Sequence, residues 1–385
     1  SDLPAIAQRM QQPLGRGVVA IQNGSNVFIS WRRLAQDPEA CKWNVYAGDM
    51  KLNSSPLSSL NLTTTTAKVP VGREVTVAPV TDGVEGEHSA AFARKSYDYR
   101  NIFVDIVYET AGSPLNSSEF NTSYVWPVDL DGDGEMDYVV DRNSLTNGMD
   151  HYVEGYLRTG EHLWTVRMGP NESTSSGQDD QICAFDIDCD GYGEVILQTS
   201  DGTQFWDPDT KDFGLYVGSS TNPDTDGDGI VDYEKQSVRN APKYMTVVDG
   251  LTGREKASCE MSYNQWYNRT NRSSLMGDEY NKHVGHVGIF FHDGIHPAIV
   301  EEWHTRDTGG GHHYYTIAFA YDYADGTATN WHELFNTPTG GATFHQIRIG
   351  DPDQDGRDEM IGGGFTMAEL FEEDVGYFAC LDAVL

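Results

Sequence analysis

Four short segments place carboxylates at alternate positions around a glycine. They are residues 129–137, 186–194, 224–232 and 351–359, called loops 1 to 4 below, and each has acidic residues at positions 1, 3, 5 and 9 and glycine at position 6. Ca²⁺ takes about six to eight oxygen ligands, including the carbonyl of position 7, and glycine permits the sharp turn. The pattern predicts four calcium sites with the residues Asp129, Asp131, Asp133, Glu135, Asp137; Asp186, Asp188, Asp190, Tyr192, Glu194; Asp224, Asp226, Asp228, Ile230, Asp232; and Asp351, Asp353, Asp355, Arg357, Glu359.

An EF-hand is the main alternative for such loops. It requires Glu at position 12 and a helix on each side. Position 12 holds Val140, Leu197, Lys235 and Gly362, and β-forming residues follow three of the loops. We therefore exclude EF-hands. Four unrelated solvated turns would not explain the repeated carboxylate at position 9, and we expect the ions to be mainly structural.

A second group of residues that could take part in catalysis lies toward the C-terminal end of the sequence. Nine of the twelve His fall between residues 283 and 345, most densely around the glycines 309–311. The set supplies hydrogen-bond donors, a base and stacking faces for acid–base chemistry on a carbohydrate. A zinc site stays an alternative, although HExxH and HxH are absent, and so does a surface loop with core aromatics. The candidate catalytic residues are His304, Arg306, His312, His313, Tyr314 and Tyr315.

Short strands separated by turns are expected to position these residues. Before residue 92, polar turns such as Leu52–Thr66 separate four strand-like stretches, which predicts a small β-sandwich of immunoglobulin or fibronectin type. The stretches are Gly17–Ile21, Asn26–Trp31, Trp43–Ala47 and Glu74–Val80.

After residue 92, an acidic glycine loop repeatedly leads into a short β-rich run. Further strand-like units, such as Tyr244–Asp249 and Thr316–Tyr321, lie between the repeats. Repetition at this scale is typical of a solenoid or a propeller. The sequence thus predicts an all-β protein, with a β-sandwich domain over residues 1–92 and a calcium-binding β-propeller over residues 93–385.

Composition excludes several classes of function. The chain of 385 residues has 59 acidic and 26 basic side chains, a formal net charge of −33, so no basic surface is expected for nucleic acid. A halophilic surface would also carry this charge, but its acidic residues would be dispersed instead of clustered with glycine. No apolar run is long enough to span a membrane. The start at Ser1 without a signal peptide fits a processed protein that is secreted, periplasmic or on the cell surface.

The order of motifs along the chain resembles polysaccharide lyase family 11, the rhamnogalacturonan lyases. The matching segments follow one another over most of the chain, and the ordered set is more specific than any single motif. They are Gly15–Ala20, Val27–Arg32, Trp43–Tyr46, Val128–Gly134, Phe185–Gly191, Thr199–Thr203, Tyr244–Val248 and His345 ahead of loop 4.

This resemblance implies an eight-bladed propeller with several Ca²⁺ ions, and cleavage of an acidic plant polysaccharide, rhamnogalacturonan I, by β-elimination at galacturonate. It also implies one central ion near the active site, held partly by His345. Arg142 and Asn143 stand where the family has a substrate-cleft Asp, so they and His345 are candidate substrate-binding residues. The Thr305-Arg306 to His313–Tyr315 stretch is enlarged relative to the family pattern.

The length after residue 92 suggests an incomplete ring. About 290 residues suffice for roughly five or six blades, so we expect a second polypeptide segment to complete the propeller. A closed, smaller propeller is the alternative. For function, the alternatives are a non-catalytic carbohydrate-binding calcium propeller of integrin or lectin kind, a lyase acting on another uronate polysaccharide, and a glycoside hydrolase.

Overall fold

In the part of the chain that the structure describes, β-strands make up nearly all the regular structure, apart from the short 3₁₀ helix η1 (Val217–Ser219). The structure is a computed structural model that describes residues 9–96, 108–110, 113–114, 120–144, 151–169, 182–219, 222, 224, 229, 243–261, 286–306, 312–339, 347–351, 355–362 and 380–381. The strands form antiparallel sheets, which confirms the predicted all-β class. No helix among these residues is long and apolar enough to cross a membrane.

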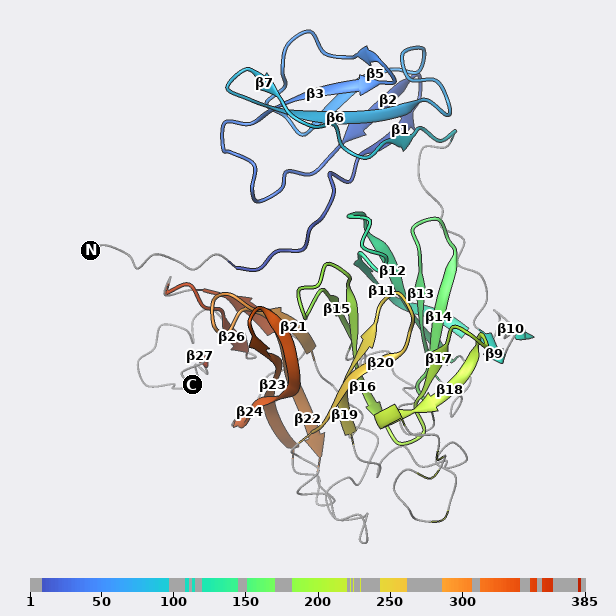
Figure 1. The fold of residues 1–385 in the computed structure, drawn as a ribbon, viewed down its shortest axis with the longest axis vertical. Coiled ribbons are helices and arrows are strands. Elements are labelled where there is room, and N and C mark those ends of the chain that lie inside the picture. The colour runs from blue at the N-terminus through green and yellow to red at the C-terminus, as the bar shows by residue number, and fades with distance from the viewer. Residues whose placement is uncertain are drawn as a thin grey trace.

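The N-terminal part contains two sheets that share one core, drawn in blue in Figure 1. This core contains Val27 and Ile29 from the first sheet, called sheet A, and Trp43, Val45 and Val75 from the second, called sheet B. All five side chains are almost completely buried. Sheet A has the order β1 (Val19–Asn23), β2 (Asn26–Ser30), β5 (Asn61–Thr65). Sheet B has the order β4 (Met50–Lys51), β3 (Lys42–Ala47), β6 (Glu74–Thr81), β7 (Val84–Glu85), and β8 (Phe92–Ala93) also pairs with β6.

One strand lies inside a segment that the sequence indicated to be a turn. Strand β5 has the sequence NLTTT and pairs with β2 along its whole length. Its exposed and half-buried residues alternate, and Leu62 packs against the shared core. Threonine is β-branched and fits a pleated strand, so a Thr-rich stretch can pair wherever one side of it is covered.

Four larger sheets follow in the described part of the chain, drawn from green to red in Figure 1. Sheet C joins β11 (Phe120–Val128), β12 (Asp137–Ser144), β13 (Tyr152–Tyr156), β14 (His162–Arg167), β17 (Gln204–Asp207) and β18 (Asp212–Tyr216). Sheet D joins β15 (Ile182–Phe185), β16 (Glu194–Ser200), β19 (Lys243–Asp249) and β20 (Glu255–Glu260). The β17–β18 hairpin comes between β16 and β19 in sequence, but it extends the edge of sheet C.

Sheet E joins β21 (His286–Phe290), β22 (Ala298–Arg306), β23 (His312–Ala324) and β24 (Thr327–Thr339). Sheet F joins β25 (Ile347–Gly350), β26 (Glu359–Gly362) and β27 (Cys380–Leu381), and a small separate pair joins β9 (Tyr108–Thr110) and β10 (Ser113–Pro114). The first strands of sheets C to F lie next to one another in sequence order: β11 beside β15, β15 beside β21, and β21 beside β25.

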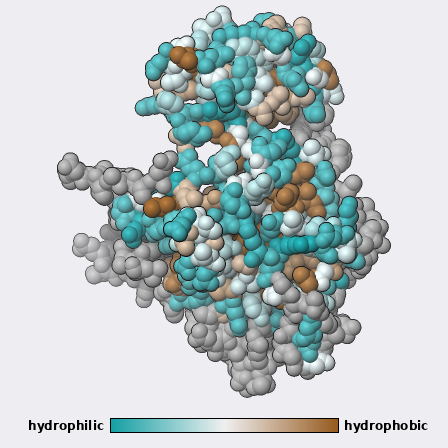
Figure 2. All heavy atoms as spheres, in the orientation of Figure 1, coloured by the Kyte–Doolittle hydropathy of each residue, from teal (hydrophilic) through white to brown (hydrophobic). Residues whose placement is uncertain are grey.

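Neighbouring sheets pack face to face. Because successive residues of a strand point to opposite faces, one strand can contribute side chains to the cores on both sides of its sheet. In β16, Val195 and Leu197 join the core shared with sheet C, whereas Ile196 joins the core shared with sheet E. In β23, Phe319 faces sheet D and Ala318 belongs to the core on the side of sheet F. Figure 2 shows a mainly hydrophilic outer face with apolar groups in small separate areas. Apolar side chains are therefore concentrated between the sheets.

Residues 9–17, called the strap below, run from sheets E and F to the N-terminal sheets (Figure 1). Arg9 donates two hydrogen bonds to the Asp358 carboxylate, at 2.9 and 2.7 Å, and the Met10 amide donates to a carbonyl in the β21–β22 turn. Pro13 lies against Gly191, and the Gly15 amide donates to the Gly134 carbonyl. The strap thus contacts loops 4, 2 and 1 in turn.

Candidate functional site

The same hydrogen bond forms within each of the four acidic loops. In each, the Oδ2 atom of the aspartate at position 1 accepts the amide hydrogen of the glycine at position 6, with N···O distances of 2.7 Å in loop 1, 3.1 Å in loop 2, 2.8 Å in loop 3 and 2.9 Å in loop 4. The glycine has a φ between 84° and 98° in all four, a region that disfavours other residues. The common spacing therefore corresponds to a common backbone turn.

Loop 1 gathers three carboxylates at its centre. Asp129, Asp131 and Asp137 each offer an oxygen, and these atoms lie within 4.8 Å of one another, a spacing that can hold a metal ion. Asp129 and Asp137 are buried, and Leu130 between them fills the core of sheets C and D. The buried leucine fixes the loop on the protein while the carboxylates on either side of it converge.

Burial makes these carboxyl groups hard to ionise in the absence of a cation. The pKa of Asp137 is raised to about 6, mainly because the group is buried and also because Asp131 and Asp133 lie nearby. Burial likewise raises the pKa of Asp129, although backbone amides donate hydrogen bonds that oppose the rise. A bound cation would favour the ionised carboxylates, so the donor set suits a hard metal ion.

Loop 2 repeats this arrangement with Asp186, Asp188 and Glu194, whose ligand atoms also lie within 4.8 Å of one another. The Ile187 amide donates to Glu194 at 2.9 Å, as the Leu130 amide does to Asp137 in loop 1. Burial raises the pKa of Asp186 to about 6, and burial followed by the charge of Asp188 raises that of Glu194. Loop 2 is thus built like loop 1.

A basic residue far away in sequence enters loop 2. The ammonium of Lys256, in β20, lies 2.5 Å from Asp188, 2.9 Å from Glu194 and 3.1 Å from Asp190. Burial alone would lower the pKa of Lys256, but Glu194 and Asp188 raise it above its usual value, so the side chain stays charged. The sequence motif gave no indication of this residue, because the spacing of the loop describes only one side of the site.

Loops 3 and 4 are described in part. In loop 4, Asp351 also accepts the Asp355 amide at 3.1 Å, Arg357 is exposed, and Glu359 is buried. The remaining predicted ligands of these loops and the predicted central ligand lie outside the described residues: Asp226, Asp228, Ile230, Asp232, Asp353 and His345.

Position 7 of loop 1 connects the loop to the N-terminal sheets. The Glu135 carboxylate accepts the Gly17 amide at 3.1 Å and the Arg32 guanidinium at 3.2 Å. The guanidinium of Arg158 lies 3.9 Å from the same carboxylate and 2.9 Å from that of Asp133. Side chains from two parts of the chain thus meet beside the candidate metal site.

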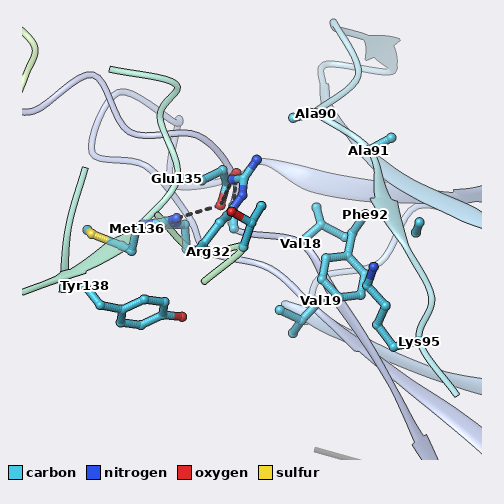
Figure 3. A pocket seen from close by; sticks show the side chains of 14 residues that line it. Val18, Val19, Arg32, Ala90, Ala91, Phe92, Lys95, Glu135, Met136 and Tyr138 are labelled. Atoms are coloured by element: carbon cyan, nitrogen blue, oxygen red, sulfur yellow. Dashed lines mark hydrogen bonds and ion pairs between the residues drawn. The ribbon is translucent and has the colours of Figure 1, made fainter. Parts of the chain in front are cut away.

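A pocket of about 350 Å³ lies at this junction. One wall is apolar, with Val18, Val19 and Phe92, and Lys95 lies near it (Figure 3). The other wall carries Arg32, Glu135, Met136, Tyr138 and Arg158. Basic side chains outnumber the single acidic one, although the chain as a whole is strongly acidic. Two of these basic side chains, Arg32 and Arg158, are paired with Glu135 and Asp133.

Arg142, a predicted substrate-binding residue, belongs to a buried polar network in sheet C. Its guanidinium donates to Glu154 at 3.0 Å and to Thr122 at 2.9 Å, and the Tyr156 hydroxyl also donates to Glu154. Its side chain is 12% exposed, and Glu154 is fully buried. These contacts hold Arg142 within sheet C, and substrate binding by Arg142 and Asn143 stays a prediction.

The candidate catalytic residues lie in the β22–β23 hairpin. The strand register places His304 opposite Tyr314, Arg306 opposite His312, Thr305 opposite His313 and Trp303 opposite Tyr315. The register therefore pairs four of the candidates with one another, whereas His313 and Tyr315 pair with Thr305 and Trp303, which are not candidates. The connecting glycines 309–311 lie outside the described residues. The roles of these six residues stay predictions.

Two family descriptions match the chain along almost its full length. "Rhamnogalacturonan I lyases beta-sheet domain" matches residues 9–94, and "Rhamnogalacturonan lyase family 11, C-terminal domain" matches residues 99–374. The second match covers well over half of the chain. The chain therefore belongs to rhamnogalacturonan lyase family 11, as the order of its motifs predicted.

Individual relatives agree with this assignment. The chain is 28% identical to the rhamnogalacturonan endolyase YesW and 26% identical to the rhamnogalacturonan exolyase YesX, both from Bacillus subtilis (strain 168). The alignments cover 94% of this chain but only 56% and 57% of those proteins. The crystal structure of YesW matches with a TM-score of 0.68 at 23% identity, and a Bacillus licheniformis rhamnogalacturonan lyase matches with 0.70 at 22%. Each structural match covers 93% of this chain and 59% of the other chain.

Proposed function

We propose that the protein cleaves rhamnogalacturonan I by β-elimination at galacturonate. The observation that carries this proposal is the pair of family matches, which follow each other in order over residues 9–94 and 99–374. The chain spans little more than half the length of the curated relatives it matches, so the activity of the whole protein is inferred from these two regions. We also propose that it acts outside the cytoplasm, where such a polymer is found.

The fold supports a more detailed architecture within this proposal. The core that sheets A and B share supports a β-sandwich domain, which we propose over residues 1–92. The face-to-face packing of sheets C to F, with their first strands side by side, supports the blades of a propeller, which we propose over residues 93–385. A second polypeptide segment that completes the ring remains part of the proposal.

Calcium is the metal that the acidic loops suit best. Their donors are carboxylates and backbone carbonyls, and Ca²⁺ prefers hard oxygen ligands in a flexible shell. Asp129, Asp131 and Asp137 would hold an ion in loop 1, which would relieve the repulsion among buried charges. A cation beside a uronate would also neutralise its carboxylate and acidify the C5 hydrogen.

The chain's own basic side chains fit an acidic polymer. In β-elimination a base takes the C5 proton, the bond from C4 to the leaving oxygen breaks, and a C4–C5 double bond forms. The hairpin residues His304, Arg306, His312 and Tyr314 are the candidates for taking the proton and for holding the uronate carboxylate. The pocket beside loop 1 adds Lys95 to the candidate contacts for a further uronate, beside the paired Arg32 and Arg158.

Product analysis tests the proposal. Rhamnogalacturonan I incubated with the full-length protein should give oligosaccharides that absorb in the near ultraviolet, because elimination leaves a conjugated uronate. Products with ordinary reducing ends and no such absorbance would show a hydrolase instead. A polymer that is retained by the protein but never shortened would show a carbohydrate-binding propeller.

A further inference from the structure

Loop 2 contains a positive charge supplied by the protein itself. The Lys256 ammonium contacts the carboxylates at positions 3, 5 and 9 of the loop, at 2.5 to 3.1 Å. An ammonium has three N–H bonds, so these contacts can use all of its donors. Two of the partners are well buried, with side-chain exposures of 9% for Asp188 and 1% for Glu194. The contact is therefore more than a surface ion pair.

The backbone directs Lys256 into the loop. In the β19–β20 ladder, Val247 pairs with Ala257 and Val248 pairs with Glu255. Lys256 is thus the extra residue of a β-bulge, a device that re-aims the side chain it carries. Its side chain is only 27% exposed. The position of the ammonium is built into the strand pairing.

Loop 1 has the same carboxylate spacing but a different cation position. Its neighbouring guanidinium groups contact positions 5 and 7 at the rim: Arg158 lies 2.9 Å from Asp133 and 3.9 Å from Glu135, and Arg32 lies 3.2 Å from Glu135. In loop 2, by contrast, the ammonium reaches positions 3 and 9 in the interior. Loop 2 nevertheless keeps an oxygen for an ion, because Oδ1 of Asp188 is buried and has no hydrogen-bond partner among the residues that the structure describes.

We infer that Lys256 is a built-in counter-ion that makes loop 2 a weaker Ca²⁺ site than loop 1. An incoming ion must displace the ammonium or bind beside a like charge, and either requirement reduces its affinity. The same ammonium neutralises part of the loop when Ca²⁺ is scarce. Two loops with the same motif should therefore respond differently to the calcium concentration.

The test is calorimetric titration of Ca²⁺ into the full-length, chelator-stripped protein. Replacing Lys256→Met should tighten one site by about tenfold or more, because a single charge is removed next to the ion. Lys256→Arg keeps the charge and should leave that site weak. The matched control is Arg254→Met, which makes the same change in net charge two residues away, where the arginine contacts Asp207 and Asp209.

Two further variants assign the affected site. Adding Asp188→Asn to Lys256→Met should abolish the gain, whereas adding Asp131→Asn in loop 1 should leave it intact. In chelator, Lys256→Met should also unfold at a lower temperature than the wild-type protein, since it leaves the loop 2 carboxylates without their counter-ion, and excess Ca²⁺ should reverse this.

The inference rests on the proposal that the loops bind Ca²⁺, and the titration separates the two. Wild-type protein that binds no Ca²⁺ at any site would overturn both. Binding that Asp131→Asn weakens but Lys256→Met leaves unchanged would overturn the role of Lys256 alone. Equal tightening by Lys256→Arg and Lys256→Met would also overturn it, because side-chain shape and not charge would then set the affinity.

Discussion

Replacing Asp137→Asn should change stability in opposite directions with and without Ca²⁺. The Asp137 carboxylate is 2% exposed and accepts the Leu130 amide at 3.1 Å and the Arg158 amide at 2.7 Å. An asparagine of the same shape keeps one accepting oxygen but turns an NH₂ group toward the other amide. The substitution thus removes the charge and about one hydrogen bond.

In chelator, loss of the charge should dominate. The folded-state pKa of Asp137 is about 6, above the usual value of 3.8, so the stability that the protonated group gives at low pH is lost as the pH rises through 6. At pH 8 the ionised carboxylate therefore costs about 3 kcal/mol relative to a neutral group. The lost hydrogen bond offsets about 1–2 kcal/mol of this. The variant should be more stable than wild type by about 1–2 kcal/mol.

In saturating Ca²⁺, loss of the ligand should dominate. If the affinity of loop 1 falls about a hundredfold, the variant loses about 2.7 kcal/mol of stabilisation by the bound ion. Subtracting this from the gain in chelator leaves the variant about 1 kcal/mol less stable than wild type. The sign of the difference therefore reverses between the two conditions.

Thermal unfolding at pH 8, in excess chelator and in excess Ca²⁺, measures both differences. A protein of this size should shift in melting temperature by about 1 °C for each kcal/mol. The control is Asp49→Asn, which removes an exposed carboxylate in the β3–β4 turn and should shift neither curve. Asp137→Asn that is destabilised in both conditions would refute the reasoning, because the carboxylate would then stabilise the loop without an ion.

Three further predictions concern the sheets and the strap. Burial lowers the pKa of His162 from 6.5 to about 4, so the stability that the neutral, buried imidazole contributes is lost as the pH falls from 6.5 to 4. His162→Gln should therefore reduce the loss of unfolding free energy over this pH range, measured in urea, by about 3 kcal/mol. Gly250→Ala should destabilise by about 3 kcal/mol or more in the same assay, because its Cβ would lie 1.8 Å from the Gly193 carbonyl oxygen. Arg9→Met should weaken the docking of the strap by about 1–2 kcal/mol, because both hydrogen bonds to Asp358 are lost. Proteolysis of residues 9–17 should then be faster than in the wild-type protein, and equal rates would contradict this.

Features with a local cause could be predicted from the sequence. The strand Tyr244–Asp249 was predicted almost to the residue, because its run of apolar and β-branched residues is buried on both faces. The turn of each acidic loop also follows from residues within the loop, since the aspartate at position 1 and the glycine at position 6 hydrogen-bond to each other. Such contacts need no knowledge of the rest of the fold.

Features that join distant segments could not be predicted in this way. Lys256 meets Glu194 across 62 residues, and its direction depends on a bulge that no motif indicates. Arg32 meets Glu135 across 103 residues, so the pocket beside loop 1 exists only because the N-terminal sheets lie against sheet C. The acidic spacing identified one half of each site, and the basic half came from tertiary packing.

The strap has a consequence for how the chain is made. Arg9 and Asp358 are 349 residues apart, so Arg9 cannot reach its partner until that length of chain has followed it out of the ribosome. At about 5–20 residues per second, that delay is roughly 20–70 seconds. Sheets A and B can pair during this time, because their strands are close together in sequence. The strap would then close last, across the ends of sheets that had already formed.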